Sequence, residues 1–168
     1  MNILFFDVSS TVMYIGYAQN NEIIDFSIRL AKRDHAKYMV ERIRQLLERN
    51  KVSIHDMDMI IVGRGPGSYT GLRIAGTVAK TLAYSTNIPL YEVSSLIFMT
   101  SGYKGLVAGL QDARRGNVFS IIYDENQIYL NDALRAFDDL KEQEIYKKSN
   151  TILVNEDTYK VNIEMIKK

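Results

Sequence analysis

The order of apolar and polar positions predicts three strands at the start of the chain. Residues 2–8 and 12–18 are mostly apolar, and residues 22–30 alternate between apolar and polar side chains. A polar segment at residues 19–21 separates two of these runs. Alternation with a period of two, interrupted by a polar turn, is typical of antiparallel strands.

A helical period follows, and strands and helices then alternate. Between residues 34 and 50 the apolar side chains recur at helical spacing, at Met39, Val40, Ile43, Leu46 and Leu47. Asp34 is the expected N-cap of this helix. The pattern then predicts a buried strand at 57–62, a helix at 74–84 and a strand at 89–93.

The second half repeats the beginning of the first. Strands are predicted at 106–111, 118–123 and 127–130, with an aspartate after the first and an asparagine in the second turn. The same order occurs over residues 3–24, with one residue fewer in the first turn. Such a repeat indicates two units of like topology. A helix at 136–148, a short strand at 151–154 and a last helix at 159–168 complete the prediction.

A glycine-rich segment, residues 63–73, joins a predicted strand to a predicted helix. Its glycines and its single proline indicate a tight turn with close backbone approach. Ser68 and Thr70 can cap the helix through their hydroxyl groups. The free N–H groups of a helix start favour an anion. The alternative is a purely structural turn that sets the helix on the sheet. The segment does not end in the Gly-Lys-Ser/Thr of a Walker loop.

Composition narrows the class of protein. The chain has 168 residues, of which 46% are hydrophobic and 24% charged, as in an ordinary globular protein. A net charge of +1 gives no electrostatic basis for direct nucleic-acid binding. The absence of cysteine excludes disulfides and thiolate metal sites. No apolar run reaches the ~20 residues of a membrane-spanning helix. We expect a cytoplasmic protein without membrane contact.

Two aspartates are the main candidates for chemistry. Asp7 and Asp112 each end the first strand of a repeat. Carboxylates in a cleft can hold Mg²⁺ or act as acid and base. An aspartate at a strand end more often accepts hydrogen bonds from the N–H groups of the following turn, and we favour this interpretation. The two histidines, His35 and His55, lie in separate segments and form no metal-binding pair.

Four arginines lie beside glycine-rich turns, namely Arg64, Arg73, Arg114 and Arg115. The planar guanidinium suits phosphate or carboxylate, although most arginines are simply solvated or paired. The residues that we consider for an anion or nucleotide site are Asp7, Ser10, Thr11, Gly65, Gly67, Ser68, Arg73, Asp112 and Arg114.

The glycine-rich segment also resembles the signature of the TsaB (YeaZ) family of bacterial threonylcarbamoyladenosine biosynthesis proteins. Residues 7–11, 33–35, 88–96 and 112–116 resemble other family segments in the same order. Ala75 stands where the family usually has glycine. The chain stops at Lys168, short of the usual C-terminal region. The resemblance implies an α/β, ribonuclease-H-like fold of the actin–hexokinase–Hsp70 superfamily. It would consist of a first lobe at 1–100 and a shortened second lobe at 101–168.

The resemblance further implies a subunit that has no catalytic residues and no metal of its own. It would support a TsaD-like catalytic partner that modifies the adenosine next to the tRNA anticodon. A TsaE-like ATPase would join the complex, tRNA would bind only through it, and ATP or ADP with Mg²⁺ would bind only within it. The family docks through two helices, either with itself as a homodimer or with TsaD. The corresponding residues are Tyr38, Arg42, Gln45, Leu72, Ala75, Gly76, Ala79, Lys80 and Ala83.

Two other functions remain open from the residues alone. A kinase-like phosphotransferase would use Asp7, Ser10, Thr11 and the loop at 65–71, but it would need a phosphate loop in each lobe. A ribonuclease-H-type nuclease would need a further carboxylate where Gly63 to Gly65 stand. We therefore favour the non-catalytic subunit.

Overall fold

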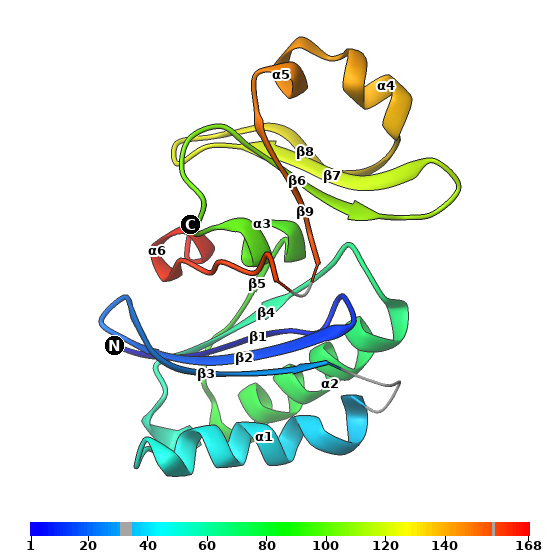
Figure 1. Cartoon of the computed structure of the whole chain (residues 1–168). Coiled ribbons are helices and arrows are strands. Elements are labelled where there is room, and N and C mark those ends of the chain that lie inside the picture. Colours follow the sequence, from blue (N-terminus) through cyan, green and yellow to red (C-terminus); the bar gives the residue numbers. More distant parts are fainter. Residues whose placement is uncertain (31–34, 156) are drawn as a thin grey trace.

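Two mixed β-sheets, connected twice by the chain, form the framework of the protein (Figure 1). The computed structural model describes residues 1–30, 35–155 and 157–168. Within this part of the chain the first sheet has five strands in the order β3-β2-β1-β4-β5, and the second has four in the order β8-β7-β6-β9. The strands of the first sheet are β1 (Asn2–Asp7), β2 (Val12–Gln19), β3 (Glu22–Leu30), β4 (Met59–Gly63) and β5 (Leu90–Val93). Those of the second are β6 (Val107–Asp112), β7 (Asn117–Tyr123), β8 (Ile128–Ala136) and β9 (Asn150–Leu153).

Helices separate and cover the two sheets, so the molecule is layered (Figure 1). The first sheet carries α1 (His35–Arg49) and α2 (Tyr69–Thr86) on its outer face. Between the sheets lie α3 (Ser95–Thr100) and α6 (Ile163–Ile166). The outer face of the second sheet is covered by α4 (Phe137–Glu142) and α5 (Glu144–Lys147). A short 3-10 helix, η1 (Ile54–Asp56), precedes β4.

The central strands of the first sheet are buried on both faces. Along β1, Leu4 and Phe6 pack into the core under α1 and α2, while Ile3 and Phe5 face the core between the sheets. This explains why residues 2–8 and 57–62 are continuous apolar runs rather than alternating ones. By contrast, β3 is an edge strand whose residues alternate between half-buried and exposed.

The predicted duplication is confirmed by the strand order. β6, β7 and β8 pair antiparallel as β1, β2 and β3 do, and β9 pairs parallel to β6 as β4 pairs to β1. In the first lobe α2 and β5 lie between β4 and α3, whereas in the second only residues 154–162 separate β9 from α6. Within the described residues, the second lobe has no counterpart of α2 and β5 between β9 and α6, and its predicted bounds of 101–168 stay a prediction.

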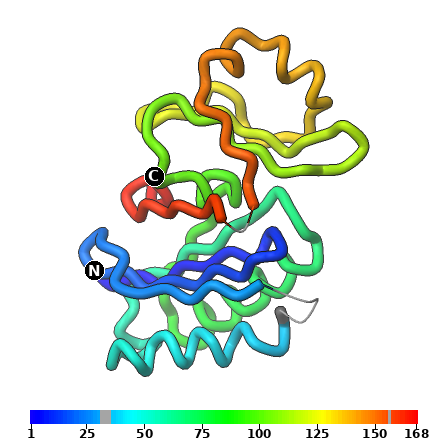
Figure 2. The backbone as a smooth tube through the Cα atoms, in the orientation of Figure 1, coloured from blue at the N-terminus to red at the C-terminus, as the bar shows by residue number. Residues whose placement is uncertain are grey.

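The segment after β9 returns to the first lobe, as the backbone trace shows (Figure 2). Lys160 exchanges backbone hydrogen bonds with Met99 and Gly102, of 2.9 and 2.7 Å. The ring of Tyr159 stacks on Tyr14, with 5.9 Å between centroids. Residues 159–166 follow the second lobe in the sequence but pack against elements of the first. The boundary between the lobes at residue 100 therefore stays a prediction.

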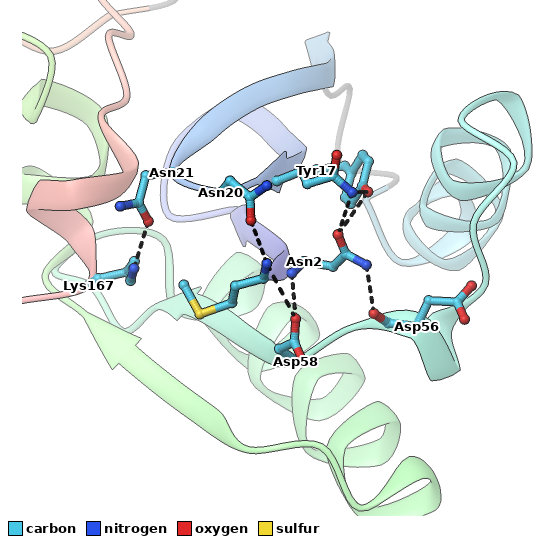
Figure 3. A network of polar contacts seen from close by, with 9 residues as sticks. Asn2, Tyr17, Asn20, Asn21, Asp56, Asp58 and Lys167 are labelled. Carbon is cyan, nitrogen blue, oxygen red and sulfur yellow. Dashed lines mark hydrogen bonds and ion pairs between the residues drawn. The ribbon is translucent and has the colours of Figure 1, made fainter.

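A polar network closes the end of the first sheet that lies away from the glycine-rich turn (Figure 3). The Asn2 backbone N–H donates to Asp58 at 2.6 Å, and the Asn2 amide donates to the Asp56 carbonyl at 2.9 Å. Lys167, just after α6, donates to Asn21 at 2.7 Å. The Asn2 contacts fasten the first strand to the segment before β4, and the Lys167 contact fastens the end of α6 to the β2–β3 hairpin.

Most predicted elements exist, with errors at their ends. The predicted helix at 74–84 begins earlier, at Tyr69, because Ser68 caps it and the helix continues through Gly71. The predicted helix at 136–148 is two short helices separated at Gln143. Of the last predicted helix only residues 163–166 are helical, and α3 was not predicted. The predicted cap Asp34 lies outside the described residues.

Candidate functional site

The glycine-rich turn presses the start of α2 against the turn that follows β1. Ser68 accepts a hydrogen bond from the Gly71 N–H at 3.3 Å, so the predicted cap is confirmed, whereas Thr70 lies inside the helix. A Cβ atom at Gly71 would lie 1.8 Å from the Val8 carbonyl oxygen. At Gly67 it would lie 2.2 Å from the Ser9 carbonyl oxygen, and φ is +153°. Only glycine fits at either position, because both obstructing atoms belong to the backbone.

Asp7 is buried beneath this turn and bonded on both carboxylate oxygens. One oxygen accepts the Ser9 N–H and hydroxyl, at 2.9 and 2.7 Å, and the other accepts the Ser95 hydroxyl at 2.5 Å. The Ser95 hydroxyl in turn accepts the Gly65 N–H at 2.9 Å. Asp7 is fully buried. Through these hydrogen bonds its carboxylate joins β1 to the glycine-rich turn and α3. The structural interpretation of Asp7 is confirmed.

Burial raises the pKa of Asp7 above its usual range, and the hydrogen bonds from Ser9 and Ser95 oppose that rise. A raised folded-state pKa means that the folded protein binds this proton more tightly than the unfolded chain does. The stability of the wild type relative to Asp7→Asn should therefore fall as the pH rises from about 4, the unfolded value. Urea unfolding of both proteins between pH 4 and 8 measures this difference. If the stability of the wild type relative to Asp7→Asn rises with pH instead, the direction of the pKa shift is wrong.

Asp112 performs the corresponding task in the second lobe. It accepts the Arg114 N–H at 2.8 Å, two residues further on, as Asp7 accepts the Ser9 N–H. Unlike Asp7, Asp112 is exposed. The turn interpretation therefore holds for both aspartates, and only Asp112 has a carboxylate that a ligand can reach.

A cleft of about 770 Å³ lies between the glycine-rich turn and the second lobe. It brings together six of the residues predicted for an anion site, namely Ser10, Thr11, Gly67, Ser68, Asp112 and Arg114. The start of α2 faces this cleft through Ser68, Thr70 and Gly71. The arrangement therefore offers hydroxyl groups, a helix N-terminus and one guanidinium to a small polar ligand.

Three of the predicted site residues are elsewhere. Asp7 is buried, and Gly65 lies against Leu72. Arg73 lies along α2, over the ring of Tyr69 at 5.5 Å. Of the other arginines considered, Arg64 pairs with Asp132 on β8 at 3.3 Å and so links the lobes.

Sequence reasoning missed Gln111, Ala113 and Phe119, which complete the cleft from the second lobe. Gln111 also lines a smaller adjoining cavity of about 400 Å³. Its side-chain oxygen is buried and has no hydrogen-bond partner within the part of the chain that the structure describes. No local signal in the sequence indicates this role for Gln111, because Phe6, which corresponds to it in the first repeat, is buried in the core.

The predicted docking residues on α1 and α2 divide into two groups. Ala75 and Ala79 are fully buried in the core of this chain, and Ala83 packs against that core. For Ala75 and Ala79 the docking prediction is wrong, because neither has exposed surface. For Ala83, which is half-buried, it stays a prediction. Leu72 is half-buried.

The other residues of that prediction remain accessible. Gln45 and Lys80 are exposed, and Tyr38 and Arg42 are half-buried. A Cβ atom at Gly76 would have nothing within 4 Å, so this face of α2 is open. Large side chains also protrude from the two helices, with exposed fractions of 92% at Tyr84, 73% at Tyr69 and 59% at Val40. Whether these residues form an interface stays a prediction.

The strand order and the duplicated lobes define a ribonuclease-H-like protein of the actin–hexokinase–Hsp70 type. The family model for TsaD, tRNA N6-adenosine threonylcarbamoyltransferase, matches residues 28–164. The crystal structure of YeaZ from Pseudomonas aeruginosa has 28% sequence identity and a TM-score of 0.71, over 80% of this chain and 66% of that chain. The chain belongs to the TsaB (YeaZ) family.

Named relatives agree with this assignment. The tRNA threonylcarbamoyladenosine biosynthesis protein TsaB of Bacillus subtilis is 36% identical over 126 residues, which are 73% of this chain. TsaB of Escherichia coli is 29% identical over 143 residues, or 81% of this chain. The matches span 55% and 62% of the lengths of these two relatives. No helix in the described part of the chain is long and apolar enough to cross a membrane.

Proposed function

We propose that this chain is a non-catalytic subunit of the complex that forms threonylcarbamoyladenosine in tRNA. In this role it supports a TsaD-like catalytic partner, which modifies the adenosine next to the anticodon, and a TsaE-like ATPase joins the complex. The chain forms a homodimer when alone, acts in the cytoplasm, and meets tRNA only through the complex. Membership of the TsaB family supports this function over the kinase-like alternative.

The observation that carries the proposal is that the carboxylate of Asp7 is inaccessible while one face of α2 is open. Asp7 is fully buried and holds three hydrogen bonds, so it serves the fold and is closed to a substrate. The exposed aromatic side chains of Tyr69 and Tyr84 project from α2, beside the open position at Gly76. Exposed aromatic residues around a small one are typical of a protein-docking surface.

Reconstitution tests this function. We expect threonylcarbamoyladenosine formation on tRNA by the TsaD-like and TsaE-like proteins of the same organism, with the carbamoyl-donor synthase, to require this chain. The chain alone should show no appreciable ATP hydrolysis, nuclease or peptidase activity. Equal formation of the modified nucleoside without the chain, or turnover by the pure chain that Asp112→Ala abolishes, would contradict the proposal.

We also propose that the cleft accepts a small anion, ATP or ADP with Mg²⁺, within the assembled complex. The start of α2 and Arg114 face the cleft, and the unpartnered oxygen of Gln111 beside them can accept a hydrogen bond from a ligand. Arg114→Ala should weaken nucleotide retention by the complex roughly tenfold, the loss of one charge-assisted contact.

Arg115→Ala is the matched control for this measurement. Arg115 also has a positive φ, 54° against 66° at Arg114, but it does not line the cleft. Both substitutions therefore place alanine at a residue with a positive φ, so any cost to the backbone conformation is the same in the two variants. Equilibrium dialysis of labelled ADP against the complex compares them. Equal retention by the two variants would exclude Arg114 from the site.

A further inference from the structure

The outward face of α2 carries positive charge and no carboxylate. Over its 18 residues the helix has no aspartate or glutamate, and its charged residues are Arg73 and Lys80. Both are exposed, and neither has an ion pair within the described chain. Helical spacing places Arg73, Thr77, Lys80 and Tyr84 on one side of α2. The buried Ala75 and Ala79 lie on the opposite side. We call the side that carries Arg73 and Lys80, with Gly76 at its margin, the α2 face.

Among the described residues, the neighbouring elements do not neutralise the α2 face. On α1, the carboxylates of Glu41 and Glu48 are both paired with Arg44. On β5, Glu92 is exposed and is in register with Val62, so it points to the same side of the sheet as α2. Within the described part of the chain, one unpaired carboxylate, Glu92, therefore stands against the two cations Arg73 and Lys80, which leaves a surplus of positive charge around Gly76.

The inference rests on the proposed function, in which the chain binds either a second copy of itself or a TsaD-like protein. The surplus of positive charge acts differently on these two partners. In a symmetric dimer the same patch of each copy faces the other, so each copy of the α2 face meets its own positive charge. A different protein can instead present carboxylates to Arg73 and Lys80. Like charges placed together suppress an association, and opposite charges accelerate and favour it.

We propose that Arg73 and Lys80 select the partner of the α2 face, disfavouring a second copy of the chain and favouring a protein whose docking helices carry carboxylates. The helix face itself supplies the shared apolar contact, through Tyr69 and Tyr84. Its charge then decides which of the two assemblies prevails when both partners are present.

Salt concentration gives the first test, because added salt screens both effects. Between 50 and 500 mM NaCl the dissociation constant of the homodimer should fall, whereas that for the purified TsaD-like protein of the same organism should rise. Sedimentation equilibrium measures the first and titration calorimetry the second. A homodimer that weakens with salt, or a heterodimer that tightens, would overturn the inference.

Neutral variants give the second test. Lys80→Gln, and Arg73→Gln with it, should tighten the homodimer and weaken the heterodimer, each by roughly two- to fivefold per charge, as for exposed ion pairs. Lys104→Gln, at an exposed position before β6, is the matched control and should change neither constant. If the wild type is monomeric at every salt concentration, the double variant should dimerise. A double variant that stays monomeric, or shifts both constants the same way, would overturn the inference.

These outcomes are distinct from a failure of the proposed function. If reconstitution shows no need for the chain, the proposed function is wrong, whatever the two dissociation constants are. If reconstitution succeeds and both assemblies form with equal sensitivity to salt and to Lys80→Gln, only the selection by charge is wrong.

Discussion

Gly67→Val should lower the free energy of unfolding by more than about 2 kcal/mol. Its Cβ would lie 2.2 Å from the Ser9 carbonyl oxygen, and the Ser68 N–H donates to that same oxygen at 2.6 Å. The clash must therefore move either β1 and its turn or the start of α2. A positive φ of +153° adds strain for a β-branched residue. Urea unfolding followed by circular dichroism measures the loss.

Gly116→Val separates the clash from the backbone strain. Gly116 also has a positive φ, +75°, but a Cβ there would have nothing within 4 Å. We expect this control to lose only the strain, on the order of 1–2 kcal/mol. If the two valine variants are equally stable, the close approach of Gly67 to Ser9 does not constrain the turn.

Gly76→Arg should abolish both the homodimer and capture of the TsaD-like partner while the chain stays folded. The side chain has open space in this structure, so the monomer can accept it, but its bulk would hold either partner away from the α2 face. Light scattering and pull-down with the purified partner, beside circular dichroism, measure assembly and fold. A folded variant that still forms both assemblies would place the interface elsewhere.

Gly76→Ala is the control for this experiment. Alanine should raise the stability of the helix by up to about 1 kcal/mol and leave both assemblies in place, because it adds a single methyl group. Gly76 is a better position for the test than Ala79, because a large side chain at the fully buried Ala79 would disrupt the core of the chain itself.

The order of strands and helices along the chain could be predicted because the apolar pattern that carries it is local. The repeat of strand, aspartate and turn at Asp7 and Asp112 was enough to predict two units with the same topology. The residues that form the turns and the cap at Ser68 also follow from local chemistry.

Packing partners could not be predicted in the same way. The spacing of Ala75, Ala79 and Ala83 indicates close helix packing, but it does not say whether the neighbour is another chain or the sheet beneath. The structure shows that Ala75 and Ala79 are buried in the core that α2 forms with the first sheet and α1. The cleft depends similarly on the distance between the lobes, so Gln111 and Phe119 could not be assigned to it from sequence.

The return of the chain after β9 gives the molecule two connections between its lobes, at residues 101–106 and 154–162. Ser10 lines the cleft, and its hydroxyl is hydrogen-bonded to that of Tyr159, in the second connection, at 2.6 Å. Because Tyr159 also stacks on Tyr14, this hydroxyl pair fixes the second connection to the first lobe at the wall of the cleft.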